Sequence, residues 1–337
     1  MRCFRAAALF AFLIAGTHSL AQEPRPAWRA DPVATAAAVT DIRQIGAAGV
    51  LFRAGGQWYR VDTCNGRLCQ TPAKAPRLAR PPSGGLPDGG VATHAGSGIV
   101  KAWYGEPTRR YDHGILGDRI EAGALVVEDR AGQRHVHRLP ETKVFEDLTP
   151  RLADLDGDER AEVVTIATSI DRGASLAVFG LKGDGLREVA ATLPIGRTHR
   201  WLNVAGIADF DGDGARDIAI VTTPHIGGTL QVWSYRSGRL SLKGSLAGFS
   251  NHFIGSRNLG LSAVADADDD GLPDLVVPDA RRQALRIVSL RDGALKPVAN
   301  LPLPARITHN LGVLRTPKGP VFLAGLEDGT LVAVRRQ

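Results

Sequence analysis

Three short stretches of the chain place acidic residues at the spacing of a metal-binding loop. In each, carboxylates stand at positions 1, 3, 5 and 9, and a glycine at position 4 or 6 lets the chain bend. The stretches are DLDGDERAE (loop 1, 154–162), DFDGDGARD (loop 2, 209–217) and DADDDGLPD (loop 3, 266–274). A hard cation such as calcium takes about six to eight oxygen ligands, whereas carboxylates this close repel one another without a cation. The pattern therefore predicts metal binding.

Two other interpretations of these loops are less favoured. An EF-hand needs flanking helices and a glutamate at position 12, but position 12 is Thr165, Ile220 or Val277 and the flanks have the composition of strands. A catalytic carboxylate pair needs two different environments, whereas these loops repeat almost identically. Plain solvated acidic turns remain the simple alternative.

The loops recur at nearly constant intervals, which indicates a repeat architecture. Their first aspartates, Asp154, Asp209 and Asp266, are 55 and 57 residues apart, and apolar runs rich in β-branched residues flank each loop. Hairpins with a glycine in the turn recur out of phase with the loops, and six of them occur along the chain. Each unit of about 55 residues is therefore expected to hold four strands.

Four-stranded units with short turns and almost no helical periodicity predict an all-β fold, a β-propeller of four-stranded blades. Six blades are favoured and seven are the alternative; a β-sandwich or a solenoid fits the long period less well. We expect a single domain over residues 37–337 with the metal-loop blades at about 145–300. A strand near Val39–Ile45 is expected to complete the last unit, so that N- and C-terminal strands close the ring. Residues 71–95 are predicted to be a Pro/Gly-rich loop, and 22–36 a loose leader.

The first 21 residues have the pattern of a secretory signal peptide. Arg2 and Arg5 precede an apolar run from Ala6 to Gly16, and Ser19-Leu20-Ala21 forms a small-x-small cleavage site. The run is too short for a stable bilayer span, so no membrane anchor is expected after cleavage. The protein is predicted to be exported, either periplasmic or secreted.

Two cysteines, Cys64 and Cys69, remain after the predicted cleavage, in the segment CNGRLC. The Asn-Gly dipeptide favours a tight turn that brings its flanks together, and an oxidising compartment favours a local disulfide over two free thiols.

The overall charge gives weak evidence for any particular partner. The full chain carries +6, and loss of the two signal-peptide arginines leaves +4. Since no run of five or more basic residues occurs, nucleic acid is not expected as a partner.

The three acidic loops resemble the calcium loops of the FG-GAP/VCBS repeat family, the integrin-alpha type of β-propeller. The resemblance covers roughly residues 145–300 and implies up to three structural calcium ions, with position 7 contributing its carbonyl. The ligands implied by this resemblance are Asp154, Asp156, Asp158, Arg160 and Glu162 in loop 1, Asp209, Asp211, Asp213, Ala215 and Asp217 in loop 2, and Asp266, Asp268, Asp270, Leu272 and Asp274 in loop 3. Loop 1 departs from the pattern, because Glu159 stands where the others have glycine, and it is expected to be the weakest site.

A second group of polar residues is expected on the opposite face, where the strands that lead into the loops begin. In a propeller these strand starts ring the central channel, and concave sites with converging polar groups are where ligands bind. The candidates are His199, Arg200, Trp201, His225, His252, Arg257, Asn258, His309 and Asn310. The alternative is that they satisfy one another's hydrogen bonds and fix the spacing of the blades. The non-repeating segment 102–118, with Arg109, Arg110, Tyr111 and His113, is a further candidate for binding, and the alternative is a degenerate blade loop.

The family resemblance implies an adhesion-like or scaffold-like module that binds a protein or carbohydrate ligand. The rival hypothesis is a periplasmic hydrolase or lyase with its site at the channel mouth. No catalytic residue can be assigned, since no G-x-S-x-G motif or zincin-type His/Glu spacing occurs, and no motif supports a quinone-dependent dehydrogenase.

Overall fold

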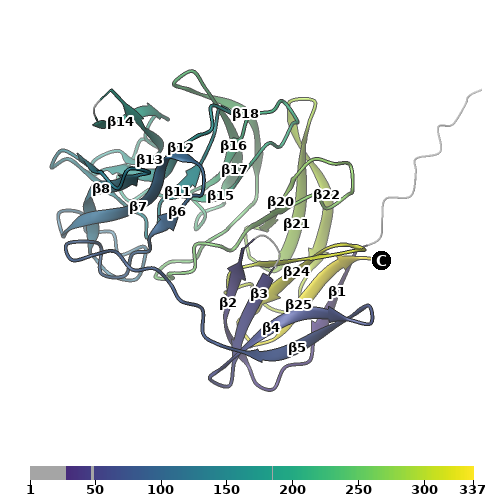
Figure 1. Ribbon diagram of the computed structural model, residues 1–337. Coiled ribbons are helices and arrows are strands. Elements are labelled where there is room, and N and C mark those ends of the chain that lie inside the picture. The colour runs from purple at the N-terminus through teal and green to yellow at the C-terminus, as the bar shows by residue number, and fades with distance from the viewer. Residues whose placement is uncertain (1–27, 47–48, 184) are drawn as a thin grey trace, which may run out of the picture.

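A computed structural model describes residues 28–46, 49–183 and 185–337, and these fold into strands joined by turns and loops (Figure 1). No helix occurs in these ranges, and they therefore contain no membrane-spanning helix. The predicted signal peptide (1–21) and residues 22–27 lie outside the described residues.

The described strands form five hydrogen-bonded sheets, four of which have four antiparallel strands. One contains β2 (Val39–Ile45), β3 (Gly49–Ala54), β4 (Gln57–Cys64) and β5 (Arg67–Ala73). The next two contain β15 (Leu202–Ala208), β16 (Asp217–Thr222), β17 (Thr229–Arg236) and β18 (Arg239–Ala247), and then β19 (Ala263–Ala265), β20 (Asp274–Pro278), β21 (Ala284–Arg291) and β22 (Ala294–Pro302). Such sheets are consistent with the blades of a β-propeller.

The fifth sheet has nine strands and contains two four-stranded groups. The first group is β6 (Ala92–Thr93), β7 (Ser97–Thr108), β8 (Glu121–Asp129) and β9 (Arg134–Arg138), and the second is β11 (Arg151–Ala153), β12 (Arg160–Ser169), β13 (Gly173–Lys182) and β14 (Gly185–Ala191). The short strand β10 (Lys143–Phe145) pairs with both β8 and β12 and so joins the groups.

The last four-stranded sheet combines the two ends of the described chain. It contains β23 (Gly312–Thr316), β24 (Gly319–Gly325) and β25 (Leu331–Arg336), and its fourth strand is β1 (Trp28–Val33). β1 pairs antiparallel with β25 along its whole length, from Trp28 opposite Arg336 to Val33 opposite Leu331.

Two predictions about the N-terminal region are therefore wrong. The segment 22–36 is not a loose leader throughout, because Trp28–Val33 form a strand whose Trp28 ring packs 6.1 Å from that of Phe322. Val39–Ile45 does not complete the last unit but begins a sheet of its own. The physical reason is that β1 already covers the free edge of β25. The segment between β5 and β6 runs over 74–91, so the predicted loop 71–95 overlaps the ends of both strands.

Each acidic loop joins the first strand of a four-stranded group to the second. Loop 1 lies between β11 and β12, loop 2 between β15 and β16, and loop 3 between β19 and β20. The three groups also share a bulge between their third and fourth strands, which leaves one unpaired residue at the same place in each. This residue is Val189 in β14, Lys243 in β18 and Val298 in β22.

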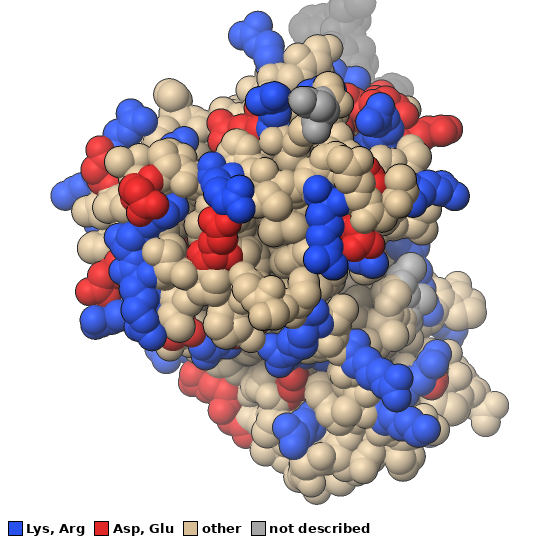
Figure 2. Space-filling view, turned by 60° about the vertical axis from the view of Figure 1, so that its left-hand side comes forward, with Lys and Arg blue, Asp and Glu red and all other residues tan. Residues whose placement is uncertain are grey.

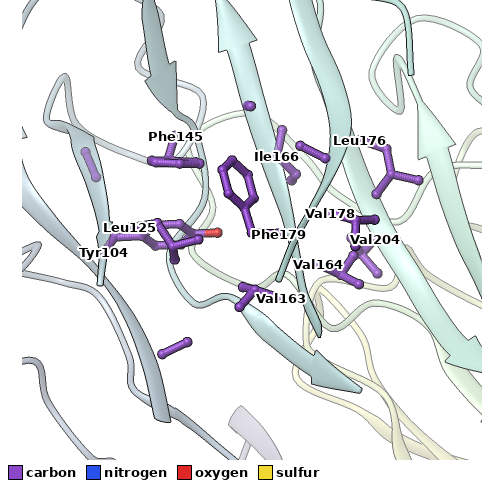
Figure 3. Close-up of a cluster of buried hydrophobic side chains, with 14 of the residues drawn as sticks. Tyr104, Leu125, Phe145, Val163, Val164, Ile166, Leu176, Val178, Phe179 and Val204 are labelled. Carbon is purple, nitrogen blue, oxygen red and sulfur yellow. The ribbon is translucent and has the colours of Figure 1, made fainter. Parts of the chain in front are cut away.

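The core lies between adjacent sheets and is filled by aliphatic and aromatic side chains. In the largest cluster the ring of Phe145 from β10 packs against those of Tyr104 of β7 and Phe179 of β13, at 5.4 and 5.6 Å between centroids (Figure 3). All three rings are fully buried, so they join the two groups of the nine-stranded sheet through apolar contact.

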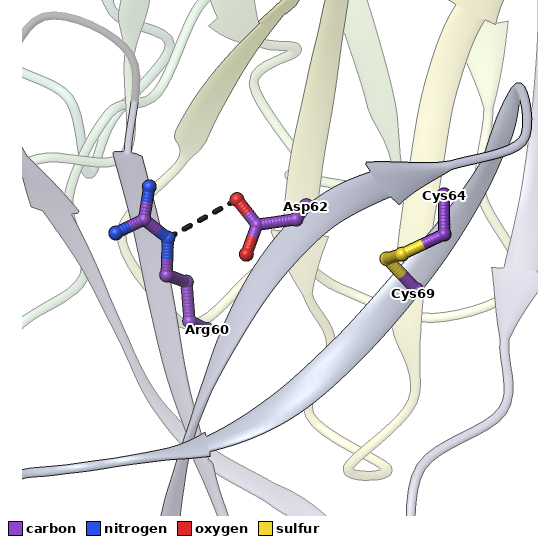
Figure 4. Close-up of a disulfide and its surroundings, with 4 residues drawn as sticks. All are labelled: Arg60, Asp62, Cys64 and Cys69. Carbon is purple, nitrogen blue, oxygen red and sulfur yellow. Dashed lines mark hydrogen bonds and ion pairs between the residues drawn. A yellow bond between two sulfur atoms is a disulfide. The ribbon is translucent and has the colours of Figure 1, made fainter.

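Cys64 and Cys69 form a disulfide across the β4–β5 hairpin, as the sequence predicts (Figure 4). Their Cα atoms are 5.7 Å apart, and the turn between them contains Asn65 and Gly66, both with positive φ. The disulfide is compatible with an extracellular protein.

Candidate functional site

The first aspartate of each acidic loop holds the loop in shape by accepting main-chain hydrogen bonds. Asp209 accepts from Gly212 at 2.8 Å and from Gly214 at 2.9 Å. Asp154 accepts from the same two positions in loop 1, and Asp266 accepts from Asp270 and Gly271, positions 5 and 6 of loop 3. Position 5 accepts from the N–H of position 7, so Arg160, Ala215 and Leu272 are bonded through nitrogen at 2.8 to 3.0 Å. These bonds orient the carboxylates before any ligand is present.

The acidic residue at position 9 is buried at or near the start of the following strand. Glu162 is 5 % exposed, and Asp217 and Asp274 are fully buried. Glu162 accepts a bond from the N–H of Leu155, and Asp274 accepts one from Ala267. Burial is the main cause that raises the pKa of Glu162 to about 7 and those of Asp217 and Asp274 to about 6. A carboxylate placed in this way gains from a neighbouring cation.

Each loop brings three carboxylates close enough together to hold a metal ion. Their oxygens lie within 4.8 Å of one another, and the groups are Asp154, Asp156 and Glu162 in loop 1, Asp209, Asp211 and Asp213 in loop 2, and Asp266, Asp268 and Asp274 in loop 3. All of these donors are carboxylate oxygens, the ligands that hard cations such as calcium prefer. The donor chemistry therefore fits the ion that the sequence suggested.

Basic side chains reach into two of the loops, and sequence reasoning missed them. In loop 2, Lys243 from β18 pairs with Asp211, Asp213 and Asp217, and Arg236 pairs with Asp213. In loop 3, Arg291 from β21 pairs chiefly with Asp270. The loop motif gives no sign of these basic residues, because they lie some 20 to 30 positions away from the acidic residues in sequence.

At the other end of the strands, the structure brings Trp201, His225 and His252 together. The Trp201 and His225 rings stack at 6.0 Å, and His252 meets Trp201 edge-on at 4.7 Å. His225 Nε2 and His252 Nδ1 share a hydrogen bond of 2.9 Å, and His252 Nε2 bonds the Ser256 carbonyl oxygen. Burial lowers the pKa of His225 to about 3 and that of His252 to about 4, so both are neutral at pH 7.

A buried glutamate, Glu146, links this cluster to the segment 102–118. Trp201 Nε1 donates to the Glu146 main-chain oxygen at 2.9 Å, and the Glu146 carboxylate bonds His113 and Thr168. His199 packs its ring 5.0 Å from His113, and its main-chain N–H donates to the Tyr111 hydroxyl. Sequence reasoning missed Glu146, because a single acidic residue outside any repeat carries no pattern.

Of the remaining candidates of this face, Arg257, Asn258 and Asn310 make contacts between separate loops, whereas Arg200 and His309 bond the residue next to them in sequence. Arg257 pairs with Asp88 and Asp118, both at 2.8 Å, and Arg200 donates to the His199 carbonyl. Asn258 Nδ2 donates to Thr308, the Asn310 side chain accepts from Gly260, and His309 bonds Thr308. These residues are not part of the Trp201–His225–His252 cluster, and the bonds of Arg257, Asn258 and Asn310 match the alternative of fixed blade spacing.

The comparisons with known proteins agree with the loop pattern. Residues 154–220 and 209–277 each match the family model described as FG-GAP-like repeat. The chain contains FG-GAP-like repeats. Each repeat starts at the first aspartate of an acidic loop and ends a few residues after the next loop, so the two repeats together cover all three loops. No curated protein matches the chain.

Proposed function

We propose that the protein is an exported, six-bladed β-propeller stabilised by calcium, which acts as a binding module. The observation that carries the proposal is the set of three in-register acidic loops with converging carboxylates. The blade count follows if β6–β9 and β11–β14 are taken as separate blades that share β10. The N-terminal β1 then completes the last blade and leaves no free edge at β25.

Calcium would act in this protein as a structural ion. Acidic residues of positions 1, 3, 5 and 9, with a carbonyl from position 7, would hold it at the turn between the first two strands of a blade. By binding only the folded state, the ion would add stability that grows with its free concentration.

The face opposite the acidic loops is the proposed ligand surface. Ile226 and Ile254 are 61 % and 68 % exposed, and each lies within two residues of the buried or half-buried His225 and His252. Exposed apolar side chains beside a rigid aromatic cluster are a common feature of binding surfaces. The charges on the face shown in Figure 2 form small separate groups of basic and acidic residues, which suits a protein or carbohydrate ligand better than nucleic acid.

Chelation tests the calcium part of this proposal. With EDTA the thermal unfolding midpoint is expected to fall by several degrees, and added calcium should restore it, because ion removal leaves the carboxylates to repel one another. Magnesium at the same concentration is the control, since it accommodates such a loop poorly. An unchanged midpoint together with no metal in elemental analysis would refute it.

The binding role is tested with a glycan array and a panel of purified extracellular-matrix and cell-surface proteins. The double variant Ile226→Ser/Ile254→Ser should weaken any interaction at least tenfold. Ile45→Ser, an exposed isoleucine in β2, is the matched control. Equal binding by the two variants would exclude this face.

A hydrolase or lyase is the second candidate, favoured by the buried Glu146 that bonds the part-buried His113. A carboxylate that orients a histidine is a common arrangement for a general base. A screen with esters, glycosides and uronate polymers tests it, and Glu146→Gln should abolish any turnover that depends on this pair. Turnover that survives in this variant would place the reaction elsewhere.

A further inference from the structure

The ammonium group of Lys243 lies among the carboxylates of loop 2. Its Nζ is 2.8 Å from Asp213 and 3.3 Å from Asp217, and it also forms a close ion pair with Asp211. The side chain is only 17 % exposed. One positive charge thus contacts positions 3, 5 and 9, three of the four acidic positions expected to hold a cation.

The backbone directs this side chain to the loop. Lys243 is the unpaired residue of the bulge between β17 and β18, and the bulges of the other two repeat blades carry Val189 and Val298 at that place. In the blade of loop 1, Val189 lies over Gly180, because a Cβ on that glycine would be 3.6 Å from a Val189 methyl group. Gly180 directly follows Phe179, which pairs with Val163, the residue after the position-9 acid Glu162, so the bulge residue stands near the end of the loop.

The set of acidic positions that come together in loop 2 also differs from the set in the other two loops. In loops 1 and 3 positions 1, 3 and 9 come together, whereas in loop 2 the group is positions 1, 3 and 5. Both oxygens of Asp217 are buried without a hydrogen bond, so Lys243 provides the nearby positive charge for this acid. In loop 1, a cavity of about 230 Å³ borders Asp158 and Glu162.

The arginine of loop 3 does not have the same position. Arg291 occupies the last paired position of its strand, as Arg236 does in the blade of loop 2. Its guanidinium bonds Asp270 and the Phe210 carbonyl, and its ion pairs with Asp274 and Asp268 are longer, at 3.7 and 4.0 Å, than those of Lys243 with the same positions of loop 2. Arg291 and Arg236 therefore pair most closely with position 5, and Arg336 pairs with Asp269 at position 4 of loop 3. Neither arginine of loop 3 comes as close to positions 3 and 9 as Lys243 does in loop 2.

We propose that Lys243 is a built-in substitute for the metal ion in loop 2, so that calcium binds loops 1 and 3 but not loop 2. An ammonium and a divalent cation repel each other at such distances, and a lysine reaches its carboxylates without any ion from solution. Loop 2 is then held closed at every calcium concentration. The expected total of two bound ions rests on the proposed function, because it assumes that loops 1 and 3 bind calcium. The difference between loop 2 and the other loops does not depend on that assumption.

The test counts bound calcium by native mass spectrometry in wild type and in Lys243→Val, which carries the valine of the sister blades. Wild type is expected to bind two ions and Lys243→Val three. Asp211→Asn added to Lys243→Val should remove the third ion. Lys296→Val, a lysine in β22 outside the loops, is the matched control and should bind two. If Lys243→Val does not fold, as judged by circular dichroism, Lys243→Gln replaces it.

The outcomes separate this inference from the proposed function. A gain of one ion on loss of Lys243 supports the inference whatever the wild-type count. Three ions in both wild type and Lys243→Val would overturn the inference and leave calcium binding intact. No ion in either protein would overturn both. No ion in wild type but one in the variant would overturn only the role of calcium in the native protein.

Discussion

Glu159 and Gly214 occupy the same position in loops 1 and 2, and both have a positive φ, +66° and +86°. The third loop has Gly271 there, with φ +89°. This left-handed conformation strains any residue with a Cβ atom. Loop 1 therefore carries backbone strain at Glu159 that loops 2 and 3 avoid by having glycine at this position.

Glu159→Gly is therefore expected to stabilise the protein by about 0.5–1 kcal/mol in excess calcium, because relief of strain outweighs the added freedom of the unfolded chain. Urea unfolding measures the change. The matched control is Glu188→Gly in β14, an exposed strand position where glycine should destabilise. A destabilised Glu159→Gly would show that the side chain, not the backbone, matters at this position.

Glu121 makes stability depend on pH. It is 1 % exposed with one carboxylate oxygen unpaired, and burial, with Glu146 nearby, raises its pKa from 4.5 to about 10. Between these values the folded state keeps a proton that the unfolded state has released, so stability falls as pH rises, by up to about 1.4 kcal/mol per unit. Glu121→Gln should flatten this slope between pH 5 and 9 in urea unfolding. A slope equal to that of wild type would contradict the assignment.

The histidine pair acts in the opposite direction. His225 and His252 have pKa values lowered from 6.5 to about 3 and 4, so their contribution is complete above pH 6.5. As pH falls toward 4 the unfolded chain takes up protons that the folded cluster excludes, and stability is lost. Nuclear magnetic resonance titration should show no protonation of His252 at pH 5.5. His252→Gln should make the unfolding free energy less dependent on pH between 6.5 and 4, whereas ordinary titration of His252 near pH 6.5 would disprove its burial.

A chain that begins at Ala34 lacks β1 and tests the joining of the two ends. It would expose the edge of β25 and the apolar face of Phe322, so a loss on the order of 2–4 kcal/mol is expected, which lowers the melting midpoint by about 3–6 °C in a chain of this size. Arg29→Ala, at a half-exposed position of β1, serves as the control and should change the midpoint little. Equal midpoints for the shortened and full chains would rule out a stabilising role for β1.

Local patterns in the sequence predicted the repeated parts of the protein well. Acidic positions, turn glycines and β-branched runs act through the adjacent backbone, so the order loop, strand, hairpin could be derived unit by unit. The Cys64–Cys69 disulfide could also be predicted from the sequence, because the Asn-Gly turn that brings the two cysteines together is local. That carboxylates of each loop come together also follows from spacing, but which three do so differs between loop 2 and the other two loops.

Contacts between distant segments were decided only by the tertiary structure. Trp28–Val33, and not Val39–Ile45, pairs with β25, because either strand has suitable composition and only the assembled sheet selects one. Glu146 bonds His113 because the loop after β10 packs against the loop between β7 and β8. Lys243 enters loop 2 because of a bulge between β17 and β18, which depends on strand register. The sequence by itself thus determined the acidic loops and the four-strand rhythm, while the fold decided which strand closes the last sheet and which cation faces each loop. The reason is that loop geometry is a property of neighbouring residues, whereas edge pairing and long-range ion pairs exist only once separate strands have packed.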